Sequence, residues 1–108
     1  MGKYVFILKN KNPSVLTKEL YFSHVDHLRR YTKEKKLSLA GPLVGQDKVL
    51  QIVEAASQAE AEQIVNEDPY VKQKHYGSYE MYELLEANEA NQWLMDTTRI
   101  QKMLSNLP

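Results

Sequence analysis

The stretch Ser23-His-Val-Asp-His-Leu-Arg-Arg-Tyr-Thr-Lys-Glu-Lys-Lys-Leu-Ser-Leu-Ala-Gly-Pro42 joins most of an amphipathic helix to a short strand that ends in Gly-Pro. At about 100° per residue, three apolar side chains share one stripe of this helix, namely Val25, Leu28 and Tyr31. His24 lies within that stripe, so its ring faces whatever the helix covers. Because a polar ring on an inward face needs a hydrogen-bond partner, the stretch predicts a polar site beneath the helix.

Over the whole chain, apolar patterning predicts four strands, at residues 4–8, 37–43, Val49–Ala55 and 76–85. A helix is expected over residues 15–36, with a break near Phe22 and Ser23. A second helix begins at the cap Ser57 and ends by Asp68, since the following proline disfavours helical geometry. The order βαββαβ predicts an α+β, ferredoxin-like domain with a four-stranded antiparallel sheet.

The two helices of such a domain cover only one face of the sheet. We therefore expect a second sheet from another copy of the chain on the other face, which makes the protein a homodimer or a higher homo-oligomer. Residues 1–86 form this domain, and residues 87–108 are an extension of it. Apolar residues recur at helical spacing in the extension, which predicts one helix over residues 88–107 that packs on protein.

Composition sets limits on location and partners. The chain has 108 residues, enough for one domain with a modest core, and its 14 Lys and Arg balance its 14 Asp and Glu. Zero net charge gives no reason to expect a nucleic-acid or membrane partner. The chain has no cysteine, which excludes disulfides and thiolate chemistry and fits a reducing compartment. With no signal-peptide pattern and no run of membrane-spanning length, a cytoplasmic location is expected.

The sequence resembles one known family in four separate pieces. These are His24 followed by Leu28, the run Leu37-Ser-Leu-Ala-Gly-Pro42, the helix start Ser57-Gln-Ala-Glu-Ala-Glu62, and Asp68-Pro-Tyr70. Together they look like the YciI-like (YCII-related domain) family over roughly residues 3–85. The resemblance implies a dimeric α+β barrel, in which two four-stranded sheets face each other. It also implies an active site built on a His–Asp pair, which by residue matching is His24 and Asp68.

Each member of this pair has a catalytic and a structural interpretation. His24 is a candidate general acid or base near neutral pH, or a buried structural histidine. Asp68 is a candidate for orienting the imidazole, or the cap of a turn that begins at Pro69. Asp68 follows the inward positions Ala61 and Ile64 by whole helical turns, so it begins on the sheet side and can approach His24.

A candidate pocket for a planar ligand combines Tyr70, Tyr79, Gly41 and Pro42. The tyrosines fit packing in the sheet or at an interface equally well. We predict no cofactor and no metal site, since His24 and His27 have the spacing for a shared metal but no apparent third ligand. His75 stands among lysines and is predicted to be exposed.

The residues and the resemblance together imply a small enzyme that uses His24 and Asp68 for acid/base chemistry, and the resemblance implies a small lactone-like or aromatic substrate. The reaction would be of lyase, isomerase or hydrolase type and independent of a cofactor. The wider superfamily of the resemblance contains small enzymes of this kind. The alternative is a non-catalytic module that binds a small ligand or another protein on the same dimeric fold.

Overall fold

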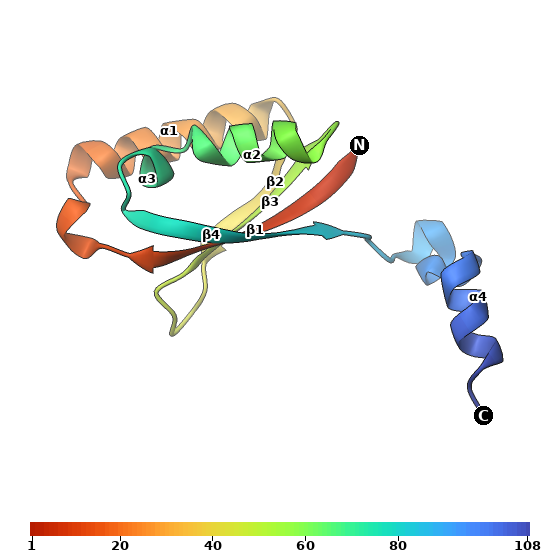
Figure 1. The fold of residues 1–108 in the computed structure, drawn as a ribbon. Helices are drawn as coiled ribbons and strands as arrows, with labels where there is room; N and C mark the ends of the chain where they lie inside the picture. Colours follow the sequence, from red (N-terminus) through yellow and green to blue (C-terminus); the bar gives the residue numbers. More distant parts are fainter.

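The computed structural model describes residues 1–108. The helical elements are η1 (Pro13–Val15), α1 (Lys18–Lys33), α2 (Gln58–Asn66), α3 (Pro69–Lys72), η2 (Glu89–Leu94) and α4 (Thr98–Ser105), where η marks a 3-10 helix. The strands are β1 (Gly2–Lys11), β2 (Leu37–Pro42), β3 (Val49–Ala55) and β4 (Tyr76–Leu84). They form one antiparallel sheet in the order β2-β3-β1-β4, with α1, α2 and α3 on one face (Figure 1). The α+β, ferredoxin-like arrangement predicted from the sequence is confirmed.

Polar side chains determine where the helices begin. Thr17 accepts the backbone amide of Leu20 and starts α1, which then runs without interruption through Ser23. The expected break near Phe22 and Ser23 is therefore wrong. The helical segment is interrupted earlier, at Leu16 and Thr17, where η1 ends and α1 begins. Further along the chain, Ser57 caps α2 and Asp68 caps α3, at the positions that the sequence indicated.

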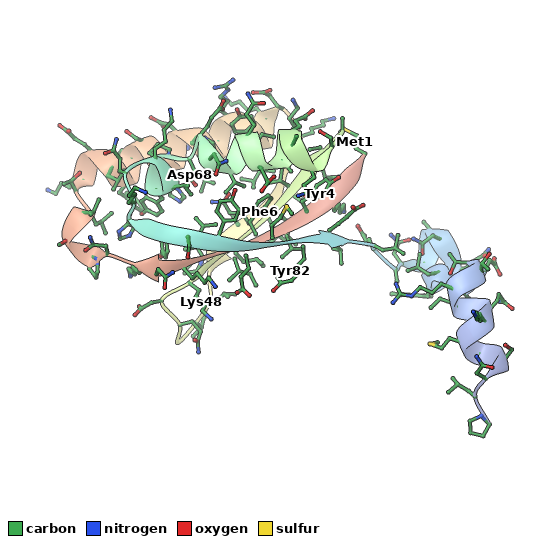
Figure 2. All side chains as sticks on the ribbon, viewed as in Figure 1. Met1, Tyr4, Phe6, Lys48, Asp68 and Tyr82 are labelled. Carbon is green, nitrogen blue, oxygen red and sulfur yellow. The ribbon has the colours of Figure 1, made fainter.

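The core lies between the sheet and the helices. Alternate residues of β1 and β3 point toward the helices and are buried, because successive side chains of a strand point to opposite faces of the sheet. Figure 2 shows Tyr4 and Phe6 on the helical side of the sheet and Tyr82 on the other side. The largest fully buried side chains include three polar residues beside the apolar ones, and the full set is Phe6, Leu8, His75, Gln51, Val53, Val65 and Asp68.

The opposite face of the sheet carries no helix (Figure 1). Cross-strand pairing places Val5 beside Ile52 and Ile7 beside Leu50, so four half-buried apolar side chains stand at its centre. Tyr82 borders this group and is 54% exposed. A contiguous apolar surface of this kind usually marks an interaction site on a folded protein.

The segment after β4 leaves the sheet and carries α4 away from the body of the molecule (Figure 1). The single helix predicted over residues 88–107 is wrong. Gln92, Trp93 and Leu94 have positive φ angles of 55°, 55° and 64°, which no α-helix contains. α4 itself spans only Thr98–Ser105.

Local hydrogen bonds explain this interruption. The side chains of Asn88 and Asn91 each accept the other's backbone amide, which closes a separate turn. Thr97 then accepts the amide of Ile100 and starts a new helix. Met103 and Leu104 of α4 are 48% and 46% exposed within this chain, so burial in the core does not override these local preferences.

No helix in the structure combines the length and the apolar character that crossing a bilayer requires.

Candidate active site

His24 projects from α1 toward the sheet, as its place in the apolar stripe predicted, and is 7% exposed. Its Nδ1 lies 2.8 Å from Oδ1 and 3.0 Å from Oδ2 of Asp68. The two residues are separated by 44 positions in the chain: His24 lies in α1, and Asp68 is the N-cap of α3. The structure therefore brings the two candidate residues into direct contact in the layer between α1 and α3.

Asp68 is completely buried and receives hydrogen bonds from three directions. Besides His24, the backbone amide of Tyr70 donates to Oδ1 at 2.9 Å, and Nε2 of Gln51 donates to Oδ2 at 2.8 Å. Burial by itself raises the pKa of this carboxyl. The hydrogen bonds and charge of His24, with the bonds from Gln51 and Tyr70, outweigh burial and hold the pKa of Asp68 below its ordinary value of 3.8. Asp68 thus caps α3 and binds the imidazole at the same time.

The contact with Asp68 defines the chemistry of the imidazole. An ionised carboxylate has no proton to donate, so Nδ1 of His24 carries the shared hydrogen. In the neutral ring Nε2 then has a free lone pair. Nε2 makes no hydrogen bond within the chain, and the structure contains no buried side-chain nitrogen or oxygen without a partner, so this atom contacts solvent. The arrangement presents a base at Nε2.

The ring of His24 is also held by stacking. The ring of Tyr70 lies parallel to it, with centroids 3.7 Å apart and an angle of 3° between the planes. Tyr70 in turn contacts the rings of His75 and Tyr76 at 4.7 and 5.8 Å. One face of the imidazole is therefore covered by an aromatic cluster that is itself packed in the core.

The four residues of the candidate pocket do not come together. Tyr70 contacts the pair, but Tyr79 packs on Phe6 and donates its hydroxyl hydrogen to Asn66 of α2. The register of β2 places Pro42 beside Val49 on the helix-covered face, whereas Gly41 pairs with Leu50 and faces the open side. Residues 41 and 42 point to opposite faces because they are adjacent in one strand.

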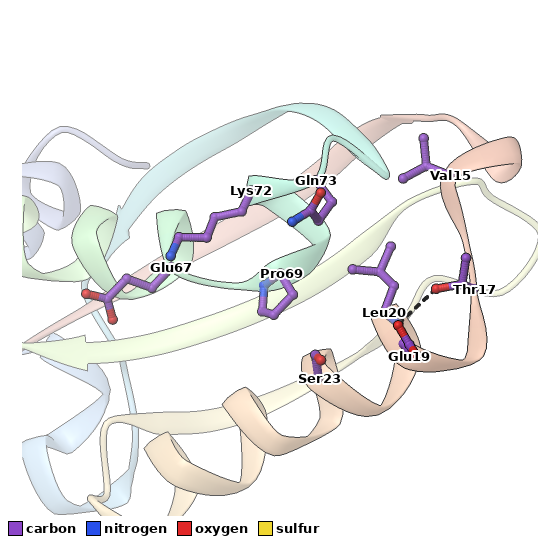
Figure 3. A pocket seen from close by; sticks show the side chains of 9 residues that line it. All are labelled: Val15, Thr17, Glu19, Leu20, Ser23, Glu67, Pro69, Lys72 and Gln73. Carbon is purple, nitrogen blue, oxygen red and sulfur yellow. Dashed lines mark hydrogen bonds between the residues drawn. The ribbon is translucent and has the colours of Figure 1, made fainter.

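The surface near the pair has one open depression, of about 510 Å³, between the first turns of α1 and α3 (Figure 3). Its walls include Ser23, Glu67 and Pro69, which are sequence neighbours of the pair, and the side chain of Lys72. The side chains of His24 and Asp68 do not line it. Most of the residues that line the depression are polar or charged, and it lies between α1 and α3 on the outer surface.

The other two histidines differ from His24. The ring of His27 is half-buried and packs edge-on against Tyr31 at 4.9 Å, and burial lowers the pKa of His27. His75 is only 2% exposed, so the prediction that it is exposed is wrong. The chain reverses at Lys74, which has a positive φ of 59°, and this turn directs His75 inward just before β4 begins.

Gln51 was not predicted from the sequence as part of the site. This residue occupies an inward position of β3, between buried valines at positions 49 and 53, and is 1% exposed. The sequence does indicate it: in the alternating pattern of β3, the inward position 51 carries an amide where an apolar residue is expected. Such a substitution indicates a buried hydrogen-bond partner, which the structure identifies as Asp68.

Fold and site together define a ferredoxin-like α+β domain with a buried histidine–aspartate pair. Residues 3–88 match the family model of the YCII-related domain, so the chain belongs to the YCII-related family. No curated protein matches the chain. Among solved structures it is similar to 5-chloro-2-hydroxyhydroquinone dehydrochlorinase (TftG) from Burkholderia phenoliruptrix AC1100, in complex with 2,5-dihydroxybenzoquinone. That similarity has a TM-score of 0.65 and 18% identity over 82% of this chain and 97% of the other, which supports the fold.

Proposed function

We propose that this protein is an enzyme in which His24 transfers protons and Asp68 orients its ring. The observation that carries the proposal is the contact of Nδ1 with both oxygens of a fully buried carboxylate, at 2.8 and 3.0 Å, while Nε2 stays unbonded. A buried capping aspartate needs no imidazole for its structural task, because a backbone amide and Gln51 already satisfy it. The additional histidine is therefore best explained by acid/base chemistry.

The proposed reaction is a proton transfer coupled to loss or rearrangement of a group. Nε2 of His24 takes a proton from an acidic C–H or O–H of the substrate, and the electron pair left behind expels a leaving group or shifts a double bond. The charged ring is stabilised by Asp68, which stays ionised. His24 then returns its proton to the product, the leaving group or water. No cofactor is needed in this scheme.

The substrate class that we propose is a small lactone-like or aromatic compound, and a hydroxylated ring in particular. A dehydrochlorinase that was solved with 2,5-dihydroxybenzoquinone has a similar fold. Removal of hydrogen chloride is a proton abstraction joined to departure of chloride, which is the type of step available to His24. At 18% identity this similarity supports a class of reaction and does not transfer a substrate.

The test is a turnover screen of chlorinated and unchlorinated hydroquinones and of small lactones, followed by absorbance and proton NMR. We expect turnover that persists with a chelator present and that falls at least about 100-fold in His24→Ala. His27→Gln is the matched control, since residue 27 lies one turn along the same helix and outside the pair. Ligand binding without turnover, equal in wild type and His24→Ala, would instead support the non-catalytic module.

We also propose that two copies pack through their open sheet faces. The support is the apolar group at the centre of this face, which includes Val5, Ile7 and Ile52. Light scattering at micromolar concentration is expected to give a dimer or a larger assembly. Ile52→Lys is expected to give monomers, whereas Lys48→Glu in the β2–β3 loop leaves the mass unchanged. A monomeric wild type would contradict the proposal.

Residues 87–108 are proposed as an extension that adds to this assembly and leaves the domain of residues 1–86 intact. Its support is the exposed apolar side of α4, which includes Leu104. Truncation after Ala87 is expected to lower the melting temperature or the oligomeric mass. Leu104→Glu should reproduce that effect, while Lys102→Glu on the same helix should not. Unchanged mass and melting temperature after truncation would count decisively against this role.

A further inference from the structure

Gln51 is the one polar residue on the helix-facing side of β3, where its inward neighbours are Val49, Val53 and Ala55. Burying an amide costs free energy unless its hydrogen bonds are restored, and an apolar residue would pack at this position without that cost. Nε2 of the Gln51 amide donates a hydrogen bond to Oδ2 of Asp68, at 2.8 Å. The hydrogen bond to the Asp68 carboxylate therefore explains why an amide stands at position 51.

The two oxygens of Asp68 are held by donors from two different elements. The amide of Tyr70, in α3, binds Oδ1, and Gln51, in β3, binds Oδ2. A carboxylate with one fixed oxygen can still rotate about its Cβ–Cγ bond, whereas one with both oxygens fixed cannot. The fixed plane is the one in which both oxygens face Nδ1 of His24. Gln51 thus links the rigid sheet to the orientation of the histidine.

Tyr70 restrains the second degree of freedom of the imidazole. Its ring lies parallel to the ring of His24 at 3.7 Å, which opposes rotation of the imidazole out of its plane. Tyr70 is 7% exposed and is wedged against His75 and Tyr76. The stack is therefore backed by the core and does not depend on a mobile surface side chain.

We infer that Gln51 and Tyr70 are positioning residues, which hold His24 in the Nδ1–H tautomer and in one ring plane so that the lone pair of Nε2 meets the substrate. The inference rests on the proposed function, and it assigns the two residues no contact with the substrate. The stack acts through the shape of an aromatic ring, so the hydroxyl of Tyr70 is dispensable for it.

The test reads the tautomer of His24 directly, by NMR of protein labelled with nitrogen-15 in its histidines, at a pH where the ring is neutral. Wild type is expected to show a protonated Nδ1 with slow hydrogen exchange. Gln51→Met, which keeps the length of the side chain but lacks the donor, is expected to give a mixture of tautomers and at least about tenfold faster exchange. Val49→Ala is the matched control, since it loosens the same inward side of β3 and leaves the hydrogen-bond partners of Asp68 in place.

For Tyr70 the paired variants are Tyr70→Phe and Tyr70→Leu. Tyr70→Phe keeps the stacked ring and is expected to leave the tautomer signal as in wild type. Tyr70→Leu removes the stacked ring and is expected to broaden the ring signals of His24. In a turnover assay Gln51→Met and Tyr70→Leu are expected to lower kcat at least about tenfold with little change of KM. A wild-type tautomer signal in both Gln51→Met and Tyr70→Leu would overturn the inference.

The two levels of proposal fail in different ways. If no compound turns over but the tautomer signal changes as expected, then the positioning is upheld and the catalytic function fails. If His24→Ala abolishes turnover while the tautomer signal is unaltered in Gln51→Met and Tyr70→Leu, then the function is upheld and the positioning role is overturned.

Discussion

Two buried histidines in this chain differ in the group that binds them. Nδ1 of His24 contacts a buried carboxylate, whereas Nδ1 of His75 lies 2.9 Å from the backbone carbonyl of Asn12. The amide of Asn12 also donates to the carbonyl of His75 at 2.7 Å, so the second pair joins two segments of chain. Both rings contact the same tyrosine, Tyr70.

The comparison shows that burial alone does not distinguish a functional histidine. His24 is 7% and His75 is 2% exposed, and both are fully supported by aromatic contacts. A carbonyl holds a ring in place but does not stabilise a positive charge as an ionised carboxylate does. We therefore expect the two histidines to respond in opposite ways to the same substitution.

The largest expected effect is on turnover, with glutamine placed at each position. His24→Gln retains a donor for Asp68 but has no group that accepts and returns a proton, so turnover should fall by about 100-fold or more. His75→Gln retains a donor for the Asn12 carbonyl, and turnover should stay within about threefold of wild type. Assays on compounds from the turnover screen, with circular dichroism to verify folding, measure both. Equal losses would remove the distinction between the two sites.

The next effect is on stability and concerns His75. His75→Ala leaves the Asn12 carbonyl without its side-chain partner and opens a void, so the free energy of unfolding should fall by about 2–3 kcal/mol. His75→Gln should recover part of this loss. Urea unfolding of the three proteins measures it. A loss below about 0.5 kcal/mol for His75→Ala would show that this histidine is not a structural link.

The pH dependence of stability tests the carboxylate beside His24. The pKa of Asp68 is lowered in the folded state, so its contribution to stability is present above about pH 3.8 and is lost as pH falls through the lower, folded-state pKa. Asp68→Asn should therefore cost about 1–3 kcal/mol near pH 7, and less as the pH falls below about 4. Urea unfolding across this range measures the difference. A cost that stays constant down to the lowest pH would contradict an ionised Asp68.

The smallest expected effect is on stability and concerns a hydrogen bond next to the His24–Asp68 pair. The hydroxyl of Tyr31 donates to Glu67, the residue before Asp68, at 2.6 Å. Burial, followed by this hydrogen bond, raises the pKa of Tyr31 to about 12, so the contribution of the bond to stability is complete below pH 10 and is lost as pH rises through 12. Tyr31→Phe should cost about 0.5–1.5 kcal/mol near pH 7 and leave turnover unchanged.

A tyrosinate absorbance titration checks the same bond. The pKa of Tyr31 is about 12, so the difference between the titrations of wild type and Tyr31→Phe should be one tyrosine that ionises near pH 12. If the variant also lost turnover, then the orientation of Asp68 would depend on Glu67 as well as on its direct partners.

Much of the fold was readable from the sequence because it depends on local rules. The period of two in β3, the cap at Ser57 and the proline after Asp68 each act within a few residues, and the structure bears them out. The extension is the exception. There, helical spacing of apolar residues predicted one helix, but the asparagine pair and Thr97 favoured a turn and a shorter helix in the absence of a packing surface.

Local sequence pattern was enough to predict the direction of His24, because helical periodicity fixes the side of α1 on which residue 24 lies. It also determined that Asp68 caps a turn, since the geometry before a proline is local. The tertiary structure alone shows which buried side chains contact His24 and Asp68. Gln51 of β3 contacts Asp68 and Tyr70 of α3 contacts His24 across long separations in the sequence, and periodicity carries no information about such contacts.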